Sequence, residues 1–241
     1  MKKLLFVFSL TMVSTVYAGD TEKSVDSKTV VVAEKTGKSA ANNEQLKAES
    51  KKKCSYIVDE ADLIFAETDE PNKVVRSTIT RLFCELEAEG EGVSEERVRK
   101  LVEEIVIPSV GTQLMSQWVL GRNWKKLSRE QKIEFIKLFK ELLVRTYAGS
   151  LSQYIGMKIT YMPFKQMTKS RKATVKLSIA RDGASEVPLA FKLRRLKDGS
   201  WKVYDALVDG ISLVANYRTT FNSIIQKDGV DALFKKLKSG E

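Results

Sequence analysis

The sequence predicts an α+β fold in which several helices pack on a curved antiparallel sheet of about four strands. Apolar residues recur every three or four positions before Gly156 and every second position after it. Near the carboxyl end, a strand around Trp201 runs almost without a linker into an amphipathic helix. Helices, then an antiparallel sheet, then helices form an α+β arrangement.

The helical half of the chain begins after Cys54. Its first helix has an apolar stripe made of Val74, Val75, Ile79, Leu82, Phe83 and Leu86. A second stripe is made of Val98, Leu101, Val102, Ile105 and Val106, and we expect Pro108 to end that helix. Ser128 and Gln131 have the spacing of a capping box, which predicts a helix start. The apolar face of this third helix is made of Ile133, Ile136, Phe139, Leu142, Leu143 and Tyr147.

The strands follow Gly156. Alternating apolar residues predict two of them, with the inward sets Ala173, Val175, Leu177, Ile179 and Val187, Leu189, Phe191, Leu193. Turns at Asp182-Gly183 and Asp198-Gly199 link these strands to a third around Trp201 and Val203. Short turns between consecutive strands predict an antiparallel meander, with a fourth strand from 158 to 164.

The last helix presents one wholly apolar face. That face is made of Leu213, Val214, Tyr217, Phe221, Ile224 and Ile225, while polar residues fall on the other side. Asp205 of the preceding strand and Arg218 of this helix have opposite charges. We expect them to pair and to hold the strand and the helix together.

The amino-terminal region predicts export. Lys2 and Lys3 precede an apolar run from Leu4 to Val13, and small residues ending at Ala18 predict a signal peptide over residues 1–18. The run is too short to span a bilayer, although a retained membrane anchor is the alternative. Residues 19–53 are rich in polar residues and predict a disordered linker, which leaves residues 54–241 as the folded domain.

Composition excludes several kinds of chemistry. The chain has no histidine, so Ser-His and Cys-His nucleophile pairs and the HExxH zinc site are all absent. Cys54 and Cys84 are its only cysteines and cannot make a four-cysteine zinc site. In an oxidising compartment they either form a disulfide or stay as two buried thiols. We expect no metal site and no cofactor.

The chain is basic, with a net charge of +10, or +8 once Lys2 and Lys3 of the predicted signal are subtracted. Basic residues gather in three places: Lys51, Lys52, Lys53; Arg122, Lys125, Lys126, Arg129; and Lys192, Arg194, Arg195, Lys197. Such clusters are either solvated faces or surfaces that attract anionic headgroups or acidic proteins. Nucleic acid is not expected, because the aromatic residues have core spacing.

Several motifs resemble those of one family. The carboxyl-terminal series contains WKVYD from Trp201, GISLVANYR from Gly210 and IIQKDG from Ile224, and the segment Val119 to Leu151 contains LLVRTYA. In order and spacing these resemble the MlaC-like, or toluene-tolerance auxiliary, family. Its members are periplasmic phospholipid-binding proteins of the outer-membrane lipid asymmetry (Mla) system. The resemblance covers about Val98 to Leu237.

The resemblance implies a function. It implies a carrier of Gram-negative bacteria that shuttles phospholipid through the periplasm between an outer-membrane lipoprotein complex and an inner-membrane ABC transporter complex. The fold then encloses an apolar lipid cavity, the cargo is a phospholipid, and the carrier is a monomer without enzymatic activity or a transmembrane segment after signal cleavage. Members carry an aromatic residue and an Asp just after the proline that ends the helix, whereas Ser109 and Val110 follow Pro108 here.

Candidate lipid-binding residues come from the apolar faces where the motifs match. They are Trp118, Leu120, Phe139, Leu143, Tyr147, Leu151, Tyr154, Val175, Leu177, Leu189, Phe191, Tyr204, Val214, Tyr217 and Phe221. Each also fits a position in an ordinary protein core. The tyrosines suit the boundary between a dry cavity and a wet mouth, because an aromatic ring ends there in a polar group.

Two other classes of function compete with the carrier. The first is a small-molecule enzyme on a cone-like α+β scaffold, in which Asp205 or Asp209 is the general base. The second is a basic adaptor that binds anionic surfaces and holds no internal ligand.

Overall fold

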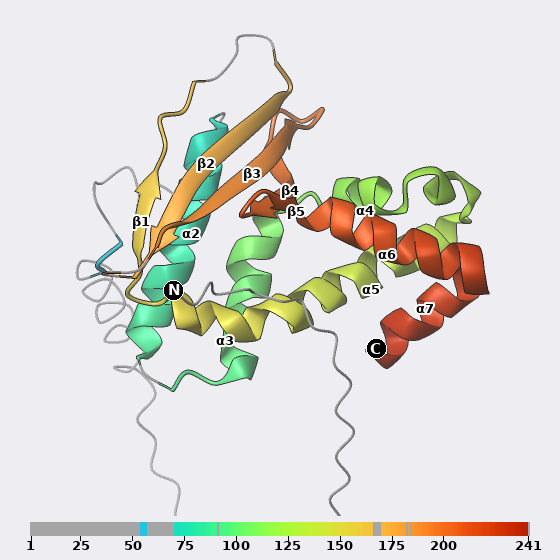
Figure 1. The fold of residues 1–241 in the computed structure, drawn as a ribbon, viewed down its shortest axis with the longest axis horizontal. Helices are drawn as coiled ribbons and strands as arrows, with labels where there is room; N and C mark the ends of the chain where they lie inside the picture. Colours follow the sequence, from blue (N-terminus) through green and yellow to red (C-terminus); the bar gives the residue numbers. More distant parts are fainter. Residues whose placement is uncertain are drawn as a thin grey trace, which may run out of the picture. The chain divides into compact units, whose positions relative to one another are not determined.

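The computed structural model describes residues 54–56, 70–90, 92–165, 170–181, 183 and 185–240, which all lie in the unit Asn43–Glu241. The predicted signal peptide and linker lie outside the described residues, as does Asp182 of the first predicted turn. The elements below are labelled as in Figure 1.

The first two predicted helices are present. Helix α2 spans Pro71–Glu89, and α3 spans Glu95–Leu101. The α-helical part of this second helix ends at Leu101, inside the apolar stripe. The chain stays helical through the π-helical turn η2 (Val102–Val106) and the 3-10 turn η3 (Ile107–Ser109). Pro108 lies in this last turn and ends the helix as predicted, because its ring nitrogen cannot donate a hydrogen bond.

The next helical segment is broken into four pieces. They are α4 (Thr112–Leu120), the 3-10 turn η4 (Gly121–Lys126), α5 (Arg129–Tyr147) and the 3-10 turn η5 (Ala148–Tyr154). The predicted capping box is confirmed at α5: the Ser128 hydroxyl accepts from the Gln131 amide, and the Gln131 side chain accepts from the Ser128 amide.

The sheet has five antiparallel strands in sequence order. They are β1 (Lys158–Tyr161), β2 (Lys172–Ala180), β3 (Val187–Arg195), β4 (Trp201–Val208) and β5 (Ile211–Ser212). The sequence predicted about four, because β5 is too short to show an alternating pattern. On the same edge of β4, Val203 forms an isolated parallel bridge with Val110, and the Gly111 amide donates to the Val203 carbonyl.

The register divides the sheet into two faces. We call the face that carries Val175, Phe191 and Leu193 the inner face and the opposite one the outer face. Helix α2 covers part of the inner face, and Figure 1 shows it behind β2 and β3. The pairing of β3 with β4 skips Tyr204, because Lys192 faces Asp205 and Leu193 faces Val203. Tyr204 is therefore the extra residue of a β-bulge.

Two helices follow the sheet, α6 (Leu213–Asp228) and α7 (Val230–Ser239). Gly229 separates them with a φ of 84°, a conformation that glycine adopts readily. Helix α7 buries Leu233, Phe234 and Leu237. The last helix predicted from the sequence corresponds to α6, and α7 was not predicted as a separate helix.

The apolar interior consists of three clusters. The helical cluster joins α4, α5, α6 and α7 around Phe135, Phe139 and Phe221. The middle cluster joins α2, α3, η2 and the end of α5 around Leu86 and Val98. The sheet cluster joins α2 to the inner face around Val75, Val175 and Leu193.

Cys54 and Cys84 form a disulfide, with 5.3 Å between their Cα atoms. This decides between the two alternatives that the sequence left open. The disulfide ties the segment Cys54–Tyr56 to α2. The Tyr56 ring stacks on Phe83 with 5.1 Å between ring centroids, and its hydroxyl accepts from the Gly156 amide and donates to the Tyr154 carbonyl.

Candidate functional site

One end of the inner sheet face is apolar and uncovered. Leu177 pairs with Leu189, Leu189 with Val208, and Val208 with Ile211, so these side chains share the inner face across four strands. Val187, Val208 and Ile211 are 38%, 51% and 65% exposed. We call Val187, Leu189, Phe191, Val208 and Ile211 the open end of the sheet. A connected set of exposed apolar residues on one face is typical of a binding surface.

The other end of the same face is an ordinary core. There Val175, Leu193 and Trp201 are at most 4% exposed, because Val75 of α2 packs against them. Helix α2 therefore covers one end of this apolar face, whereas Val187, Val208 and Ile211 at the other end remain exposed. A face that served only as core would be covered along its whole length.

The turn η5 lies beside the open end. The Arg181 guanidinium, just after β2, donates to the Gln153 carbonyl of η5 at 3.2 Å. Leu151 and Tyr154 of η5 are half-buried and pack in the middle cluster with Ile159 of β1. Two of the candidate residues are thus held at the edge of the open end.

The helical side contributes a pair of tyrosines. Tyr147 at the end of α5 and Tyr217 of α6 are both half-buried, and their hydroxyl oxygens are 3.5 Å apart. The Tyr217 ring meets Phe139 edge-on at 5.4 Å between centroids. Burial, together with the Tyr217 hydroxyl, raises the pKa of Tyr147 well above its usual range. The Tyr147 phenol therefore stays neutral at physiological pH and offers a hydrogen bond without charge.

The structure distributes the candidate residues over several environments. The helical cluster contains Leu120, Phe139, Leu143, Val214, Tyr217 and Phe221; the middle cluster contains Leu151 and Tyr154; and the sheet cluster contains Val175, Leu177, Leu189 and Phe191. Leu120, Phe139, Val175, Leu177, Val214 and Phe221 are at most 5% exposed. The half-buried members are the ones with surface available to a ligand: Leu143, Tyr147, Leu151, Tyr154, Leu189, Phe191 and Tyr217.

Trp118 and Tyr204 lie elsewhere, on the outer face of the sheet. Their rings stack with 5.6 Å between centroids, and the Arg218 guanidinium lies 5.8 Å from the Trp118 ring centroid. Arg218 also donates from two nitrogens to the Trp118 carbonyl. The bulge turns Tyr204 away from the inner face. The structure therefore does not bring these two rings together with the other candidates.

Asp205 does not pair with Arg218, so that prediction was wrong. Its carboxylate accepts from the Ser212 hydroxyl, the Val214 amide and the Lys192 ammonium, at 2.8, 3.1 and 3.2 Å. The predicted role is nevertheless filled, because these bonds tie β4 to the start of α6. Arg218 lies more than a helical turn further along α6 and finds the Trp118 carbonyl instead.

The geometry offers little to an enzyme in the described part of the chain. Asp205 is 4% exposed and its oxygens are engaged by three donors, so it is not poised to take a proton from a substrate. Asp209 is exposed in the β4–β5 hairpin, where its φ is 50°. Within the described residues no group of His, Cys, Asp and Glu is arranged to hold a metal ion.

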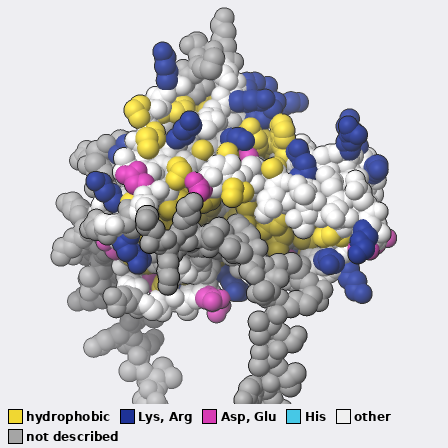
Figure 2. Space-filling model, viewed as in Figure 1, with side chains coloured by type: hydrophobic (Ala, Val, Ile, Leu, Met, Phe, Trp, Pro, Cys, Tyr) yellow, Lys and Arg dark blue, Asp and Glu magenta, His cyan; other side chains and the backbone are white. Residues whose placement is uncertain are grey.

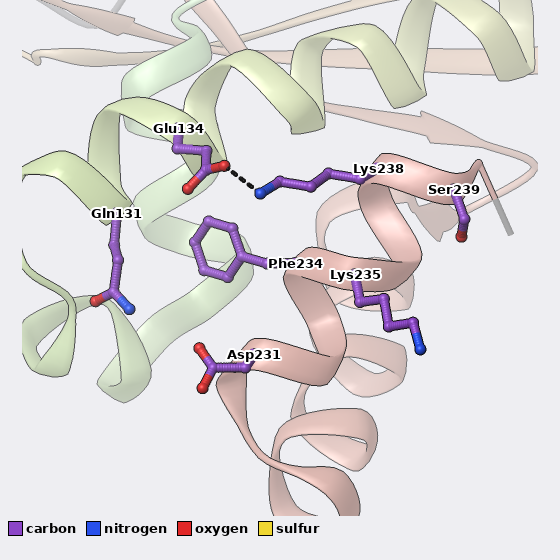
Figure 3. Close-up of a pocket in the computed structure, with 7 residues that line it drawn as sticks. All are labelled: Gln131, Glu134, Asp231, Phe234, Lys235, Lys238 and Ser239. Carbon is purple, nitrogen blue, oxygen red and sulfur yellow. Dashed lines mark ion pairs between the residues drawn. The ribbon is translucent and has the colours of Figure 1, made fainter.

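A hollow of about 580 Å³ lies between α5 and α7 (Figure 3). It is lined by Gln131, Glu134, Asp231, Phe234, Lys235, Lys238 and Ser239. Lys238 and Glu134 form an ion pair of 2.7 Å across it, and Phe234 is the one apolar residue of the lining. A polar, charged lining of this kind does not suit an apolar ligand.

Sequence reasoning missed Val208, Ile211 and Tyr56 as members of the site or its edge. Val208 and Ile211 flank the tight turn Asp209-Gly210, and that turn was a signal for a hairpin that extends the inner face. Tyr56 carried no signal, because its partners Tyr154 and Gly156 lie about a hundred residues away in the sequence.

The fold and the site together define an α+β protein with a partly uncovered apolar sheet face and no catalytic centre in its described residues. Residues 76–239 match the MlaC protein family, and the chain belongs to this family. This family match begins at residue 76 in α2, whereas the motif resemblance in the sequence began at about Val98. No helix of the described residues is long and apolar enough to cross a membrane.

Named relatives agree with this assignment. The chain is 29% identical to the intermembrane phospholipid transport system binding protein MlaC of Haemophilus influenzae, over 72% of this chain and 82% of that protein. It is 26% identical to the toluene tolerance protein Ttg2D of Pseudomonas putida, over 70% and 79%. A phospholipid-binding protein from Ralstonia solanacearum, solved in complex with a phospholipid, superposes with a TM-score of 0.66 at 25% identity, covering 71% of this chain and 96% of that one.

Proposed function

We propose that this protein is a periplasmic phospholipid carrier whose cargo binds at the open end of the sheet, between β3, β4 and β5 on one side and the end of α5 with η5 on the other. The observation that carries the proposal is the open end of the inner face, where apolar residues of three strands remain exposed. The MlaC family consists of lipid-binding carriers without enzymatic activity, and the Ralstonia relative was solved with a phospholipid.

The physical chemistry of transfer supports an apolar site. Two acyl chains contain about 30 methylene groups, so shielding them from water contributes about 24 kcal/mol at roughly 0.8 kcal/mol each. A bilayer shields the same chains equally well. Exchange between membrane and carrier is therefore close to balanced, and the carrier needs an apolar surface more than a tight charged trap for the headgroup.

The half-buried residues are suited to such exchange. Leu189, Phe191, Leu143 and Leu151 keep part of their surface exposed, so a ligand covers apolar area that is otherwise in water. On the helical side of the proposed site, the Tyr147 and Tyr217 hydroxyl groups would offer hydrogen-bond donors to an ester group of a lipid. The fully buried candidates, such as Phe139 and Leu177, support these walls from behind.

Partners follow from the same role. The Haemophilus relative is named for an intermembrane phospholipid transport system. We infer that this chain exchanges lipid with an outer-membrane lipoprotein complex and with an inner-membrane ABC transporter complex. A carrier that visits two membranes in turn functions most simply as a monomer.

Photo-crosslinking at single positions tests the location of the site. A benzophenone amino acid at Val208 or Leu189 should form an adduct of phospholipid mass in protein purified from the periplasm of a Gram-negative host. The same amino acid at Lys125, an exposed position of η4 away from the sheet, should form none. Adducts at Lys125 and none at the open end would place the cargo elsewhere, and absence of lipid from well-folded protein in native mass spectrometry would contradict the carrier itself.

Charged substitutions test the same surface by a second route. Phe191→Asp should abolish lipid loading, because a carboxylate facing hydrocarbon is costly, and thermal melts would show that the variant is folded. The matched control is Lys125→Glu at an exposed position of η4, away from the sheet. Lys192→Glu is unsuitable as a control, because it would place a second carboxylate beside Asp205.

A further inference from the structure

The outer face of the sheet is strongly basic. Residues paired in register give this face Lys158, Lys172, Lys176, Lys192, Arg194 and Lys202. Asp205 is the only acidic residue in the described strands, and Lys192 lies 3.2 Å from it. Figure 2 looks onto this face and shows Lys and Arg side chains gathered over the ends of β2 and β3.

The basic residues form rows across neighbouring strands. Lys172 of β2 faces Arg194 of β3, which faces Lys202 of β4. Neighbouring strands lie about 4.8 Å apart, so these three basic side chains leave the sheet from adjacent positions in one row, and the Lys202 ammonium donates to the Pro108 carbonyl at 2.8 Å. Like charges directly opposite each other across a sheet are destabilising, and such an arrangement is expected where an anionic surface offsets the repulsion.

Aromatic and apolar groups lie among these charges. Trp118 is 38% exposed and stacks on Tyr204 of the outer face. Met162 follows β1, is 41% exposed, and donates its amide to the Lys176 carbonyl of β2. Tryptophan and tyrosine rings with a wet end and an apolar end favour the headgroup region of a bilayer.

We propose that the outer face of the sheet docks this protein, as a peripheral contact, on bilayers that contain anionic phospholipid. Four of the five lysines and Arg194 lie on β2, β3 and β4, and lysine is depleted from protein–protein interfaces but favoured near anionic lipid surfaces. The open end of the sheet lies on the opposite face of the same strands. The inference concerns a different surface from the cargo site and stands whether or not the interior holds lipid.

Vesicle flotation with a pair of matched triple variants tests this docking. The face variant is Lys172→Gln/Lys176→Gln/Arg194→Gln, which leaves the Lys192–Asp205 pair intact. The matched variant is Lys125→Gln/Lys126→Gln/Arg129→Gln, which removes two lysines and one arginine from exposed positions of η4 and α5. The full mature chain is used, with thermal melts to show that each variant is folded.

At low salt the parent should float with vesicles of phosphatidylethanolamine and phosphatidylglycerol and should stay behind with pure phosphatidylcholine. Each basic residue near an anionic surface is worth about a fivefold change in partitioning, so the face variant should bind roughly 100-fold more weakly. The matched variant should change little. Physiological salt should weaken the parent's binding, because it screens exposed charges beyond about 8 Å.

Three results would overturn the proposal. In the first, both triple variants lose binding equally, so that only net charge matters. In the second, the face variant binds as the parent does. In the third, the parent does not bind anionic vesicles but forms a salt-sensitive complex with a purified acidic protein, and only the face variant loses that complex. The face would then be a protein-docking surface.

Discussion

At the scale of single residues, Asp205 is a buried carboxylate with a structural role. Burying a carboxylate is costly unless donors satisfy it, and here a hydroxyl, a helix-terminal amide and an ammonium do so. The amide belongs to the first turn of α6, where a negative charge is favoured by the helix dipole. The residue that an enzyme hypothesis would select thus has a structural task.

Replacing Asp205 by Asn should lower the free energy of unfolding by about 1–3 kcal/mol, because the charge-assisted bonds weaken and Lys192 loses its partner. Lys192 is 37% exposed and is rehydrated, which keeps the effect below that of a fully buried pair. Urea denaturation would measure it.

The control for Asp205 is Asp209→Asn, an exposed residue at a positive φ that Asn tolerates. It should change stability by less than about 0.5 kcal/mol. Asp205→Asn protein that remains folded should still carry lipid. A variant as stable as the parent but empty of lipid would contradict the structural role.

The raised pKa of Tyr147 predicts how the stability of the fold depends on pH. This pKa is raised by burial, so the phenol keeps its proton in the folded chain at pH values where the unfolded chain, with a pKa near 10, has lost it. Stability contributed by this group is complete below about pH 10 and falls as the pH rises above that value. The melting temperature of the parent, relative to Tyr147→Phe, should therefore decline between pH 9 and pH 11. A difference that stays constant over this range would mean that Tyr147 ionises equally in both states.

At the scale of elements, the signals that predicted well are local. The capping box at Ser128, the alternation in β2 and β3, and the break at Pro108 are each decided within a few residues, and all three are present in the structure. The two-residue strand β5 is too short to alternate, so only the turn Asp209-Gly210 signals it. The conversion of α3 into a π-helical turn at Val102 has no pattern of its own in the sequence.

The Cys54–Cys84 disulfide is the element-scale contact most easily tested. It closes a loop with a sequence separation of 30, which contributes about 3–4 kcal/mol in the chain-entropy description. Cys54→Ser/Cys84→Ser should lower the free energy of unfolding by roughly that amount in urea. Phe83→Leu, which weakens the stacking of Tyr56 and shortens one side chain of the middle cluster, serves as a control with a smaller loss. A double serine variant as stable as the parent would show that the bond does not contribute to the fold.

At the scale of the whole domain, the candidate site illustrates what one sequence leaves undecided. Periodicity identified Val175, Leu189 and Phe191 as inward residues, and the register confirms that they share a face. Periodicity did not tell which part of the face α2 covers, because that depends on where the helix crosses the strands. Nor did it reveal that the bulge at Tyr204 turns this ring to the outer face, where it stacks on Trp118 of α4.

The boundary of the folded domain gives the last prediction. Residues 19–53 lack the apolar content for a core, so their deletion should leave the melting temperature and the lipid content nearly unchanged. A deletion only three residues longer, of residues 19–56, also removes Cys54, Ser55 and Tyr56. It should be clearly less stable, because the disulfide, the bond from the Ser55 amide to Glu87 and the stacking on Phe83 are lost together. The two deletions should be compared by calorimetry and by lipid extraction from periplasmic protein, and equal melting temperatures would mean that the domain begins after Tyr56.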